Sequence, residues 1–235
     1  MRLGLFADPH YCRAYVLCRT RRPRLSLGKI REAMEAFAAS GVELCICMGD
    51  LIDHCDSAEE SRQCLDEVMS LIRSYPLPFR LLPGNHDYGV FSAEEFFART
   101  GCPTPPCMLD TDSHRLIFLD ANYRSDFRRF DGAGVDWKDA NLPPEQLVFL
   151  QTALSDIDKP CVVLIHENLD DGVQIDHVVK NAGDARRIIE ESGKVPLVIQ
   201  GHYHKGADRI INGIRYLTLP AMCEGEGNHY LVLDI

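Results

Sequence analysis

The chain of 235 residues lacks any Cys-x-x-Cys pair, although it contains ten cysteines. Zinc sites and the disulfide frameworks of small secreted domains use regular cysteine spacings, so this scatter indicates neither. Some cysteines fall in apolar runs, where a thiol behaves as a small hydrophobe: Cys45, Cys47 and Cys161. We therefore expect reduced thiols in a cytoplasmic protein, with four loop thiols open to oxidation: Cys12, Cys18, Cys102 and Cys107.

Long apolar runs and a basic excess are missing too. No stretch approaches the about 20 apolar residues of a membrane span, and the first run, at 2–7, is too short for a signal peptide. Thirty-five acidic residues outnumber 25 basic ones and give a net charge of −10. A protein that coats nucleic acid needs a basic surface. We therefore expect neither a nucleic-acid nor a membrane partner, and the sequence predicts no oligomeric state.

The composition is that of an ordinary globular protein, with 46% apolar and 26% charged residues. The chain shows no internal repeat, low-complexity tract or linker. We therefore expect a single domain over residues 1–235. A domain of this size can bury about 70–75% of the surface of its unfolded chain.

Short apolar runs alternate with amphipathic segments. Buried strands are predicted at 3–7, 44–48, 79–82, 115–119, 161–165 and 197–200. Two later runs alternate in polarity and are predicted as strands that close a sheet, at 214–219 and 230–234. Loops are expected at 11–25, 101–112 and 120–141.

Helices are predicted between these strands from their starting signals. Ser26 is a candidate N-cap of a helix to about residue 40, and Ser57-x-x-Glu60 and Ser92-x-x-Glu95 indicate capping boxes. Two further helices are predicted at 143–154, where prolines occupy the first turn, and at 184–192. Alternating strands and helices predict an α/β fold whose strands are buried on both faces.

Polar clusters follow five of the predicted strands. Because sites in such folds lie outside the carboxyl ends of the strands, we expect all five clusters to meet along one sheet rim. The clusters are Asp8-x-His10, Gly49-Asp50-x-x-Asp53, Gly84-Asn85-His86-Asp87, His166-Glu167-Asn168 and Gly201-His202-x-His204. Taken alone, Gly-Asn-His-Asp is equally the composition of an ordinary turn.

The converging side chains offer oxygen and imidazole donors without thiolate: Asp8, His10, Asp50, Asn85, His166, His202 and His204. Such donors suit a borderline divalent ion such as Mn, Fe or Zn. One open catalytic ion needs about three protein ligands, so this larger set suits two adjacent ions that share a carboxylate. Two ions about 3.5–4 Å apart form a clamp for in-line displacement at phosphorus.

These ordered motifs, from residue 8 to residue 204, resemble those of the calcineurin-like metallophosphoesterase superfamily. The resemblance implies two packed mixed β-sheets flanked by helices, a four-layer αββα sandwich with a dinuclear centre. It implies a first metal held by Asp8, His10, Asp50 and His204, and a second held by Asp50, Asn85, His166 and His202. Asp50 would then bridge the ions. It also implies that His86 protonates the leaving oxygen and that Asp53 and Asp87 orient ligands. Many relatives have a different pair after the lone histidine, which leaves the pocket wall near Glu167 undefined.

Five arginines crowd the segment after the first motif, at 13, 19, 21, 22 and 24. They would either grip a second phosphate of a substrate or form a solvated charged loop. This loop and the alternating tail also resemble the manganese-dependent ADP-ribose/CDP-alcohol diphosphatase branch. Candidate substrate-binding residues are Arg19, Arg21, Arg22 and Asn122, the last of which follows the strand at 115–119.

Residues outside the motifs are given structural roles. The only tryptophan, Trp137, is expected to pack, or alternatively to stack on a base from a loop at the site rim. Four histidines are expected at the surface or in packing: His54, His114, His177 and His229.

The features together predict a dinuclear metal-dependent hydrolase of phosphoester bonds. The favoured activity is that of a phosphodiesterase or diphosphatase on small nucleotide-like substrates. Alternatives are a protein or small-molecule phosphomonoesterase, a nuclease, and a non-catalytic interaction scaffold of the same fold. The acidic composition counts against a nuclease. Retention of every candidate ligand and of His86 counts against a scaffold.

Overall fold

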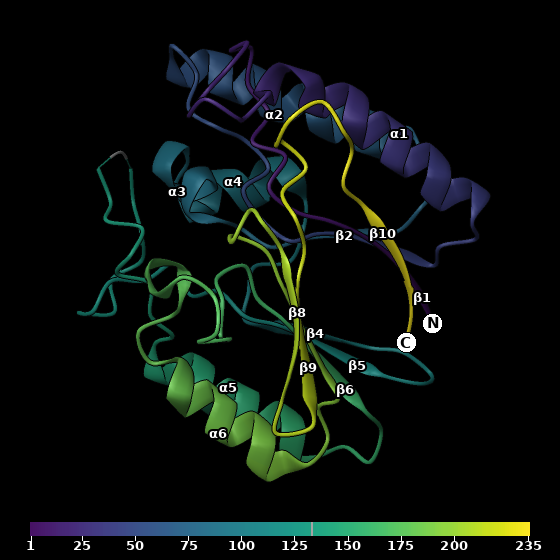
Figure 1. Cartoon of the computed structure of the whole chain (residues 1–235), viewed down its shortest axis with the longest axis vertical. Coiled ribbons are helices and arrows are strands. Elements are labelled where there is room, and N and C mark those ends of the chain that lie inside the picture. Colours follow the sequence, from purple (N-terminus) through teal and green to yellow (C-terminus); the bar gives the residue numbers. More distant parts are fainter. Residues whose placement is uncertain (133) are drawn as a thin grey trace.

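A computed structural model describes residues 1–132 and 134–235. Two β-sheets pack against each other and helices cover their outer faces, so the layers run helix, sheet, sheet, helix (Figure 1). One outer layer contains α1 (Ser26–Ala39), α2 (Ala58–Arg73), α3 (Asn85–Val90) and α4 (Ala93–Thr100). The other contains α5 (Pro144–Ser155) and α6 (Ala182–Ser192). The predicted four-layer fold class is confirmed.

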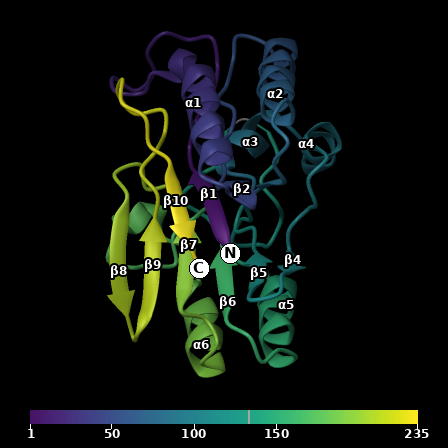
Figure 2. The same cartoon turned by 90° about the vertical axis from the view of Figure 1, so that its right-hand side faces the viewer.

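The first sheet has four strands in the order β10-β1-β2-β3. β1 (Arg2–Phe6), β2 (Leu44–Cys47) and β3 (Phe79–Leu81) run parallel. β10 (Leu231–Asp234) pairs antiparallel with β1, which brings the two ends of the chain side by side (Figure 2). The first three polar clusters therefore follow neighbouring parallel strands.

The second sheet has six strands in the order β4-β5-β6-β7-β9-β8. Its centre is parallel: β5 (Arg115–Phe118), β6 (Cys161–Leu164), β7 (Leu197–Gln200) and β9 (Ile214–Thr218). Antiparallel strands form its edges: β4 (Cys107–Asp110) and β8 (Ala207–Ile211). Neither edge strand was predicted, and the expectation of a loop over 101–112 was wrong for β4. Both strands are half exposed, so they lack the apolar run that marks a buried strand.

We expected the five polar clusters to share one sheet rim, and this expectation was wrong. Three follow strands of the four-stranded sheet, and two follow β6 and β7 of the six-stranded sheet. An apolar run indicates a strand buried on both faces, but the choice of pairing partner depends on long-range contacts. The sequence pattern therefore could not divide the strands between sheets.

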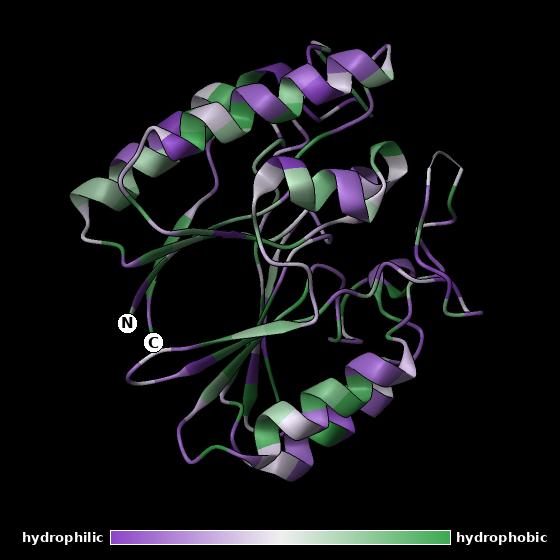
Figure 3. Cartoon of the chain, turned by 180° about the vertical axis from the view of Figure 1, so that it is seen from behind, coloured by the Kyte–Doolittle hydropathy of each residue, from purple (hydrophilic) through white to green (hydrophobic). Residues whose placement is uncertain are grey.

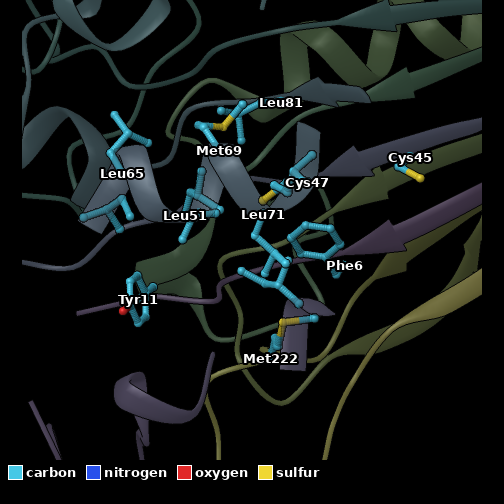
Figure 4. Close-up of a cluster of buried hydrophobic side chains, with 14 of the residues drawn as sticks. Phe6, Tyr11, Cys45, Cys47, Leu51, Leu65, Met69, Leu71, Leu81 and Met222 are labelled. Atoms are coloured by element: carbon cyan, nitrogen blue, oxygen red, sulfur yellow. The ribbon is translucent and has the colours of Figure 1, made fainter. Parts of the chain in front are cut away.

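Apolar side chains fill three layers. Between the sheets lie residues such as Leu3, Leu5 and Leu164. Phe6, on the opposite face of β1, packs toward the α1–α2 layer in the cluster drawn in Figure 4, while α5 and α6 cover the other sheet. The helices carry alternating hydrophilic and hydrophobic bands, which suits their position between sheet and solvent (Figure 3). Burial of both sheet faces explains the continuous apolar runs of the strands.

The helix starts confirm Ser57 and Ser92 as N-caps and correct the prediction for Ser26. Ser57 and Ser92 each accept a hydrogen bond from the backbone N–H three residues later, at 3.1 Å. The reciprocal half of a capping box does not form at Ser57, because the Glu60 carboxylate accepts the backbone N–H of Asp56 at 3.2 Å. Ser26 does not cap α1; it is the first residue of the helix, and its hydroxyl donates to the carbonyl of Pro9. The preceding turn η1 (Pro23–Leu25) leads directly into α1, so the helix needs no side-chain cap there.

The ten cysteines are free thiols. Among the described residues, no helix combines the length and the apolar character that a bilayer crossing requires.

Candidate metal centre

The strand ends that meet at the site hold an unusual backbone conformation. Asp8, His10, Asp50 and His202 have φ of 52°, 47°, 52° and 65°, the left-handed region that residues other than glycine seldom adopt. Hydrogen bonds between the loops hold this conformation, including His10 N–H to the Asp50 carbonyl at 2.9 Å. Such backbone geometry persists where the surrounding structure over-determines it, and it concentrates at functional sites.

Two motif glycines are required because neighbouring side chains lie too close for a Cβ atom. Gly49 has a φ of 105°, and a Cβ there would overlap the His166 ring. A Cβ at Gly84 would overlap the carboxylate of Asp50. Gly49 therefore allows the strand ends of the two sheets to come together, and Gly84 allows two loops of the four-stranded sheet to do the same.

One group of donor atoms gathers around His10. Its Nε2 lies 3.2 Å from Nε2 of His204, 3.4 Å from Oδ2 of Asp50 and 3.8 Å from Oδ1 of Asp8. The same Asp8 oxygen lies 3.6 Å from Nε2 of His204. Residues that stand up to 196 positions apart in the sequence thus surround one point.

Neighbouring carboxylates determine the tautomers of these two rings. Nδ1 of His204 donates to Oε1 of Glu224 at 2.7 Å, and this hydrogen bond lowers the pKa of Glu224 to about 2. Nδ1 of His10 lies 3.3 Å from Oδ2 of Asp53, and burial lowers the pKa of His10 to about 3. Both rings therefore present Nε2 lone pairs to each other. Facing lone pairs at hydrogen-bond distance repel unless a cation or a shared proton lies between them.

A second group of donors lies on the other side of Asp50. Oδ2 of Asp50 is 3.4 Å from Nε2 of His166, and the His202 ring offers a third donor within 4.8 Å of both. Nδ1 of His166 donates to the carbonyl of Met48 at 2.6 Å, which leaves its Nε2 as a lone pair. Oδ1 of Asp50 accepts the backbone N–H of His86 at 2.8 Å. Asp50 is therefore common to both groups, and one of its oxygens remains free.

Several buried atoms at the centre have no hydrogen-bond partner among the described residues, and four of them face the donor groups: Asp8 Oδ1, Asn85 Oδ1, His166 Nε2 and His202 Nε2. Buried polar atoms are nearly always paired, so a cluster of orphans needs an explanation. All four are oxygen or imidazole donors of the kind that bind borderline divalent ions. Burial also raises the pKa of the Asp8 carboxyl, because it disfavours the charged form. A bound cation offsets this cost by stabilising the carboxylate. The residues present therefore fit metal ions.

A chain of charged groups leads away from the first donor group. Nδ1 of His86 lies 2.9 Å from Oδ1 of Asp53, whose Oδ2 lies 3.3 Å from Nη1 of Arg21. Burial raises the pKa of Asp53, but hydrogen bonds with His10 and His86 outweigh it and hold this pKa far below its usual range. Burial lowers the pKa of His86, but the charges of Asp50 and Asp53 outweigh it and raise the pKa overall. His86 can therefore hold a proton at the site.

Asp87 connects two motif loops through hydrogen bonds. Its carboxylate accepts the backbone N–H groups of Leu51, Ile52 and Gly84 at 3.3, 3.1 and 2.9 Å. Burial raises its pKa to about 7.

A cavity of about 260 Å³ opens over the donors, lined by Cys18, Arg21, Asp50, Asn85, His86, Trp137, His177, His202, His204 and Glu224. Of the four candidate substrate-binding residues, Arg21 is in this lining and the other three are not. Arg19 is exposed, the Arg22 guanidinium donates to backbone carbonyls of its own loop, and Asn122 is buried with its amide donating to Asp120. A larger hollow of about 550 Å³ beside Lys159 and Lys194 contains none of the motif residues.

The structure adds cavity residues that the motifs did not indicate. Glu224 orients His204, and Cys223 places its thiol near His10 and His204. His177, expected as a surface or packing residue, lines the cavity beside Trp137. Cys223 and Glu224 lie on a loop and His177 ends the short turn η2 (Ile175–His177), and no local pattern sets them apart from neighbouring positions.

The joined rims of a two-sheet sandwich, carrying imidazole and carboxylate donors, are the arrangement that the resemblance to metallophosphoesterases implies. The chain belongs to the calcineurin-like phosphoesterase family, whose model matches residues 1–206. The family uses divalent metals, and the donor groups described above supply candidate ligands.

Known proteins share this fold at low sequence identity. A dimetal phosphatase from Danio rerio aligns over 98% of this chain and 91% of its own, with 18% identity and a TM-score of 0.80. GAP50, described as the anchor in the inner membrane complex of Plasmodium, aligns over 97% of this chain and 75% of its own, with 12% identity and a TM-score of 0.62. A probable cyclic nucleotide phosphodiesterase of Psychrobacter arcticus is 22% identical over 77% of this chain. That match spans 63% of the relative, less than two thirds of its length.

Proposed function

We propose that this chain is a dinuclear phosphodiesterase or diphosphatase that acts on small nucleotide-like substrates in the cytoplasm. One observation carries the proposal. Oδ2 of Asp50 lies 3.4 Å from Nε2 of His10 and 3.4 Å from Nε2 of His166, so a single carboxylate oxygen serves both donor groups. A shared carboxylate of this kind is what two adjacent cations require.

The two donor groups support the ligand sets that the family resemblance implies. The first ion would be held by Asp8, His10, Asp50 and His204, and the second by Asp50, Asn85, His166 and His202. Bound Mn, Fe or Zn would neutralise the phosphoryl oxygens and activate a water for in-line attack. The chain itself supplies rigid, pre-oriented donors, because Glu224 and the Met48 carbonyl determine which ring nitrogen of His204 and His166 is free.

His86 is the proton donor to the leaving oxygen in this proposal. It lines the cavity, and Asp53 accepts from its Nδ1 and stabilises the imidazolium. Asp87 holds the loop that carries Asn85 and His86 against the loop that carries Asp50 and Asp53. Acid catalysis by a positioned histidine typically contributes about 10²–10⁴ in rate.

Three features support a small, anionic, nucleotide-like substrate. Arg21 lines the cavity beside the centre, and its planar guanidinium suits an anionic group next to the one that reacts. The Psychrobacter relative is described as a probable cyclic nucleotide phosphodiesterase. A cavity of about 260 Å³ suits a small molecule rather than a protein surface or a polynucleotide.

The test compares hydrolysis of bis(p-nitrophenyl) phosphate with that of p-nitrophenyl phosphate by purified protein with added Mn²⁺. We expect the diester to be cleaved with the higher kcat/KM. A clear preference for the monoester would overturn the diesterase proposal in favour of a phosphomonoesterase. A panel of cyclic nucleotides, ADP-ribose, CDP-alcohols and glycerophosphodiesters then identifies the substrate class.

The second candidate function is a non-catalytic interaction scaffold. It is favoured only by the shared fold of GAP50, a protein described as an anchor. Metal analysis together with the turnover assay separates the two functions. Bound metal without turnover of any ester in the panel would support the scaffold.

A further inference from the structure

We propose that Trp137 and His177 form a base-stacking wall at one end of the cavity and that Arg21 binds an anionic group at the other end. The site would then select phosphoesters that carry a nucleobase on one side of the scissile phosphorus and a second negative charge on the other. This inference rests on the proposed function and names the part of the substrate that the site recognises.

The two rings of the wall lie against the second donor group. Trp137 and His177 have ring centroids 5.1 Å apart at an interplanar angle of 57°. Each also contacts the ring of His202, with centroid distances of 5.3 Å for Trp137 and 5.0 Å for His177. An aromatic surface therefore adjoins the position of the reacting phosphoester.

The wall is held in place by contacts behind it. Lys138 lies 5.6 Å from the centroid of the Trp137 ring and pairs with Asp176 at 2.9 Å, which links the Trp137 loop to the turn η2 (Ile175–His177). The carbonyl of His177 accepts the backbone N–H of Asn168 at 3.1 Å. A pre-positioned ring loses little freedom when it binds a partner, which favours recognition.

Trp137 is not placed as a core residue. It is partly exposed, it lines the cavity, and it belongs to none of the three apolar clusters formed by the described residues. Its aromatic neighbours are the two histidines, and Nδ1 of His177 is buried without a hydrogen-bond partner among the described residues. A ring face together with an unpaired ring nitrogen suits a base, which offers both a π-face and polar edges.

Arg21 occupies the other end of the site. It pairs with Asp53, which contacts His10 and His86 of the first donor group, whereas the wall contacts His202 of the second. Asp50 lies between these two groups. The contacts therefore place the guanidinium of Arg21 at one end of the site, the metal centre in the middle and the aromatic wall at the other end. A substrate that spans the site needs an anionic group at the first end and a flat ring at the second.

The first test uses the fact that Trp137 is the only tryptophan of the chain, so selectively excited tryptophan emission reports on this wall. We would titrate the Mn²⁺-treated protein with AMP and with ribose 5-phosphate, which carries the same phosphate without a base. AMP should quench the emission in a saturable manner, and ribose 5-phosphate should not. Equal responses to the two ligands, or none to AMP, would overturn the proposal.

The second test measures kcat/KM for ADP-ribose, which carries both a base and a second phosphate, and for a glycerophosphodiester. Stacking on one aromatic ring is worth about 5- to 150-fold in affinity, so Trp137→Ala should reduce the nucleotide preference roughly 10-fold, mainly through KM. Trp137→Phe should restore most of the preference. Phe127→Ala, at an exposed aromatic in the same segment, is the matched control and should keep the wild-type preference.

The outcomes separate this inference from the function on which it rests. Equal losses on both substrates in Trp137→Ala would indicate a structural role and refute the wall. Turnover of bis(p-nitrophenyl) phosphate without base-dependent quenching would leave the phosphoesterase intact while removing the stacking proposal. Base-dependent quenching without turnover of any ester would support the stacking wall while removing the phosphoesterase proposal.

Discussion

Glu224 accepts a hydrogen bond from Nδ1 of His204 at 2.7 Å, and this contact leaves Nε2 of His204 free to face Asp8 and His10. The two residues stand 20 positions apart on different loops. A carboxylate behind a ligating histidine fixes its tautomer and increases its basicity. Glu224 therefore belongs to the candidate metal centre although it would not bind metal itself.

Glu224→Gln should weaken metal binding by about 10- to 100-fold, because the amide no longer supplies a negative charge behind His204. Isothermal titration of the metal-free protein with Mn²⁺ measures the effect. Glu226→Gln, two residues further on and exposed, provides the control. An affinity equal to that of the wild type in Glu224→Gln would contradict the role given to this carboxylate.

Asp50→Ala should remove both ions, since Oδ2 of Asp50 faces both donor groups at 3.4 Å. Elemental analysis of purified protein gives the metal content per chain. Asp56→Ala, an exposed acidic residue after the same motif, should retain the wild-type content. Two ions per chain in the Asp50 variant would refute the bridging role.

His86→Ala should retain metal but slow turnover by about 10²–10⁴-fold, because the leaving oxygen would lose its proton donor. The loss should shrink for esters with an acidic leaving group, which departs without a proton. Rates for a series of aryl phosphodiesters of graded leaving-group pKa test this. The control is His54→Ala, an exposed histidine whose ring centroid lies 6.0 Å from that of His86. Equal losses across the series would show that His86 is not the acid.

Gly4→Ala should destabilise the fold by about 1–3 kcal/mol, because overpacking a filled core forces side chains out of their preferred rotamers. A Cβ at Gly4, in the centre of the first sheet, would lie 2.7 Å from the ring of Phe37 on α1. Urea unfolding monitored by circular dichroism measures the free energy of unfolding.

Gly28→Ala is the matched control for this prediction, since a Cβ at this exposed position on α1 meets nothing within 4 Å. Its effect should be neutral or stabilising by up to about 1 kcal/mol, because alanine has the higher helix propensity. A Gly4 variant as stable as the wild type would show that α1 can shift away from the sheet.

Local sequence was sufficient for the family and the fold class. Strands buried on both faces appear as apolar runs, and their carboxyl ends carry the motif residues, so motif order and strand order could be identified together. Helical spacing likewise identified the face of α1 that packs on the sheet, at Ile30, Met34 and Phe37. The structure brings the seven candidate ligands to one place, while their roles as ligands stay a prediction.

What the sequence by itself determined, then, is that this chain belongs to the calcineurin-like phosphoesterase family and folds as an αββα sandwich, because contiguous segments carry the motifs and the strands. Tertiary structure alone decided how the strands divide between two sheets, that β4 and β8 form the edges, and that Glu224, Trp137 and His177 reach the cavity. The physical reason is the same in each case. Edge pairing and loop placement depend on contacts between residues far apart in the chain, and such contacts leave no periodic pattern near any one of them.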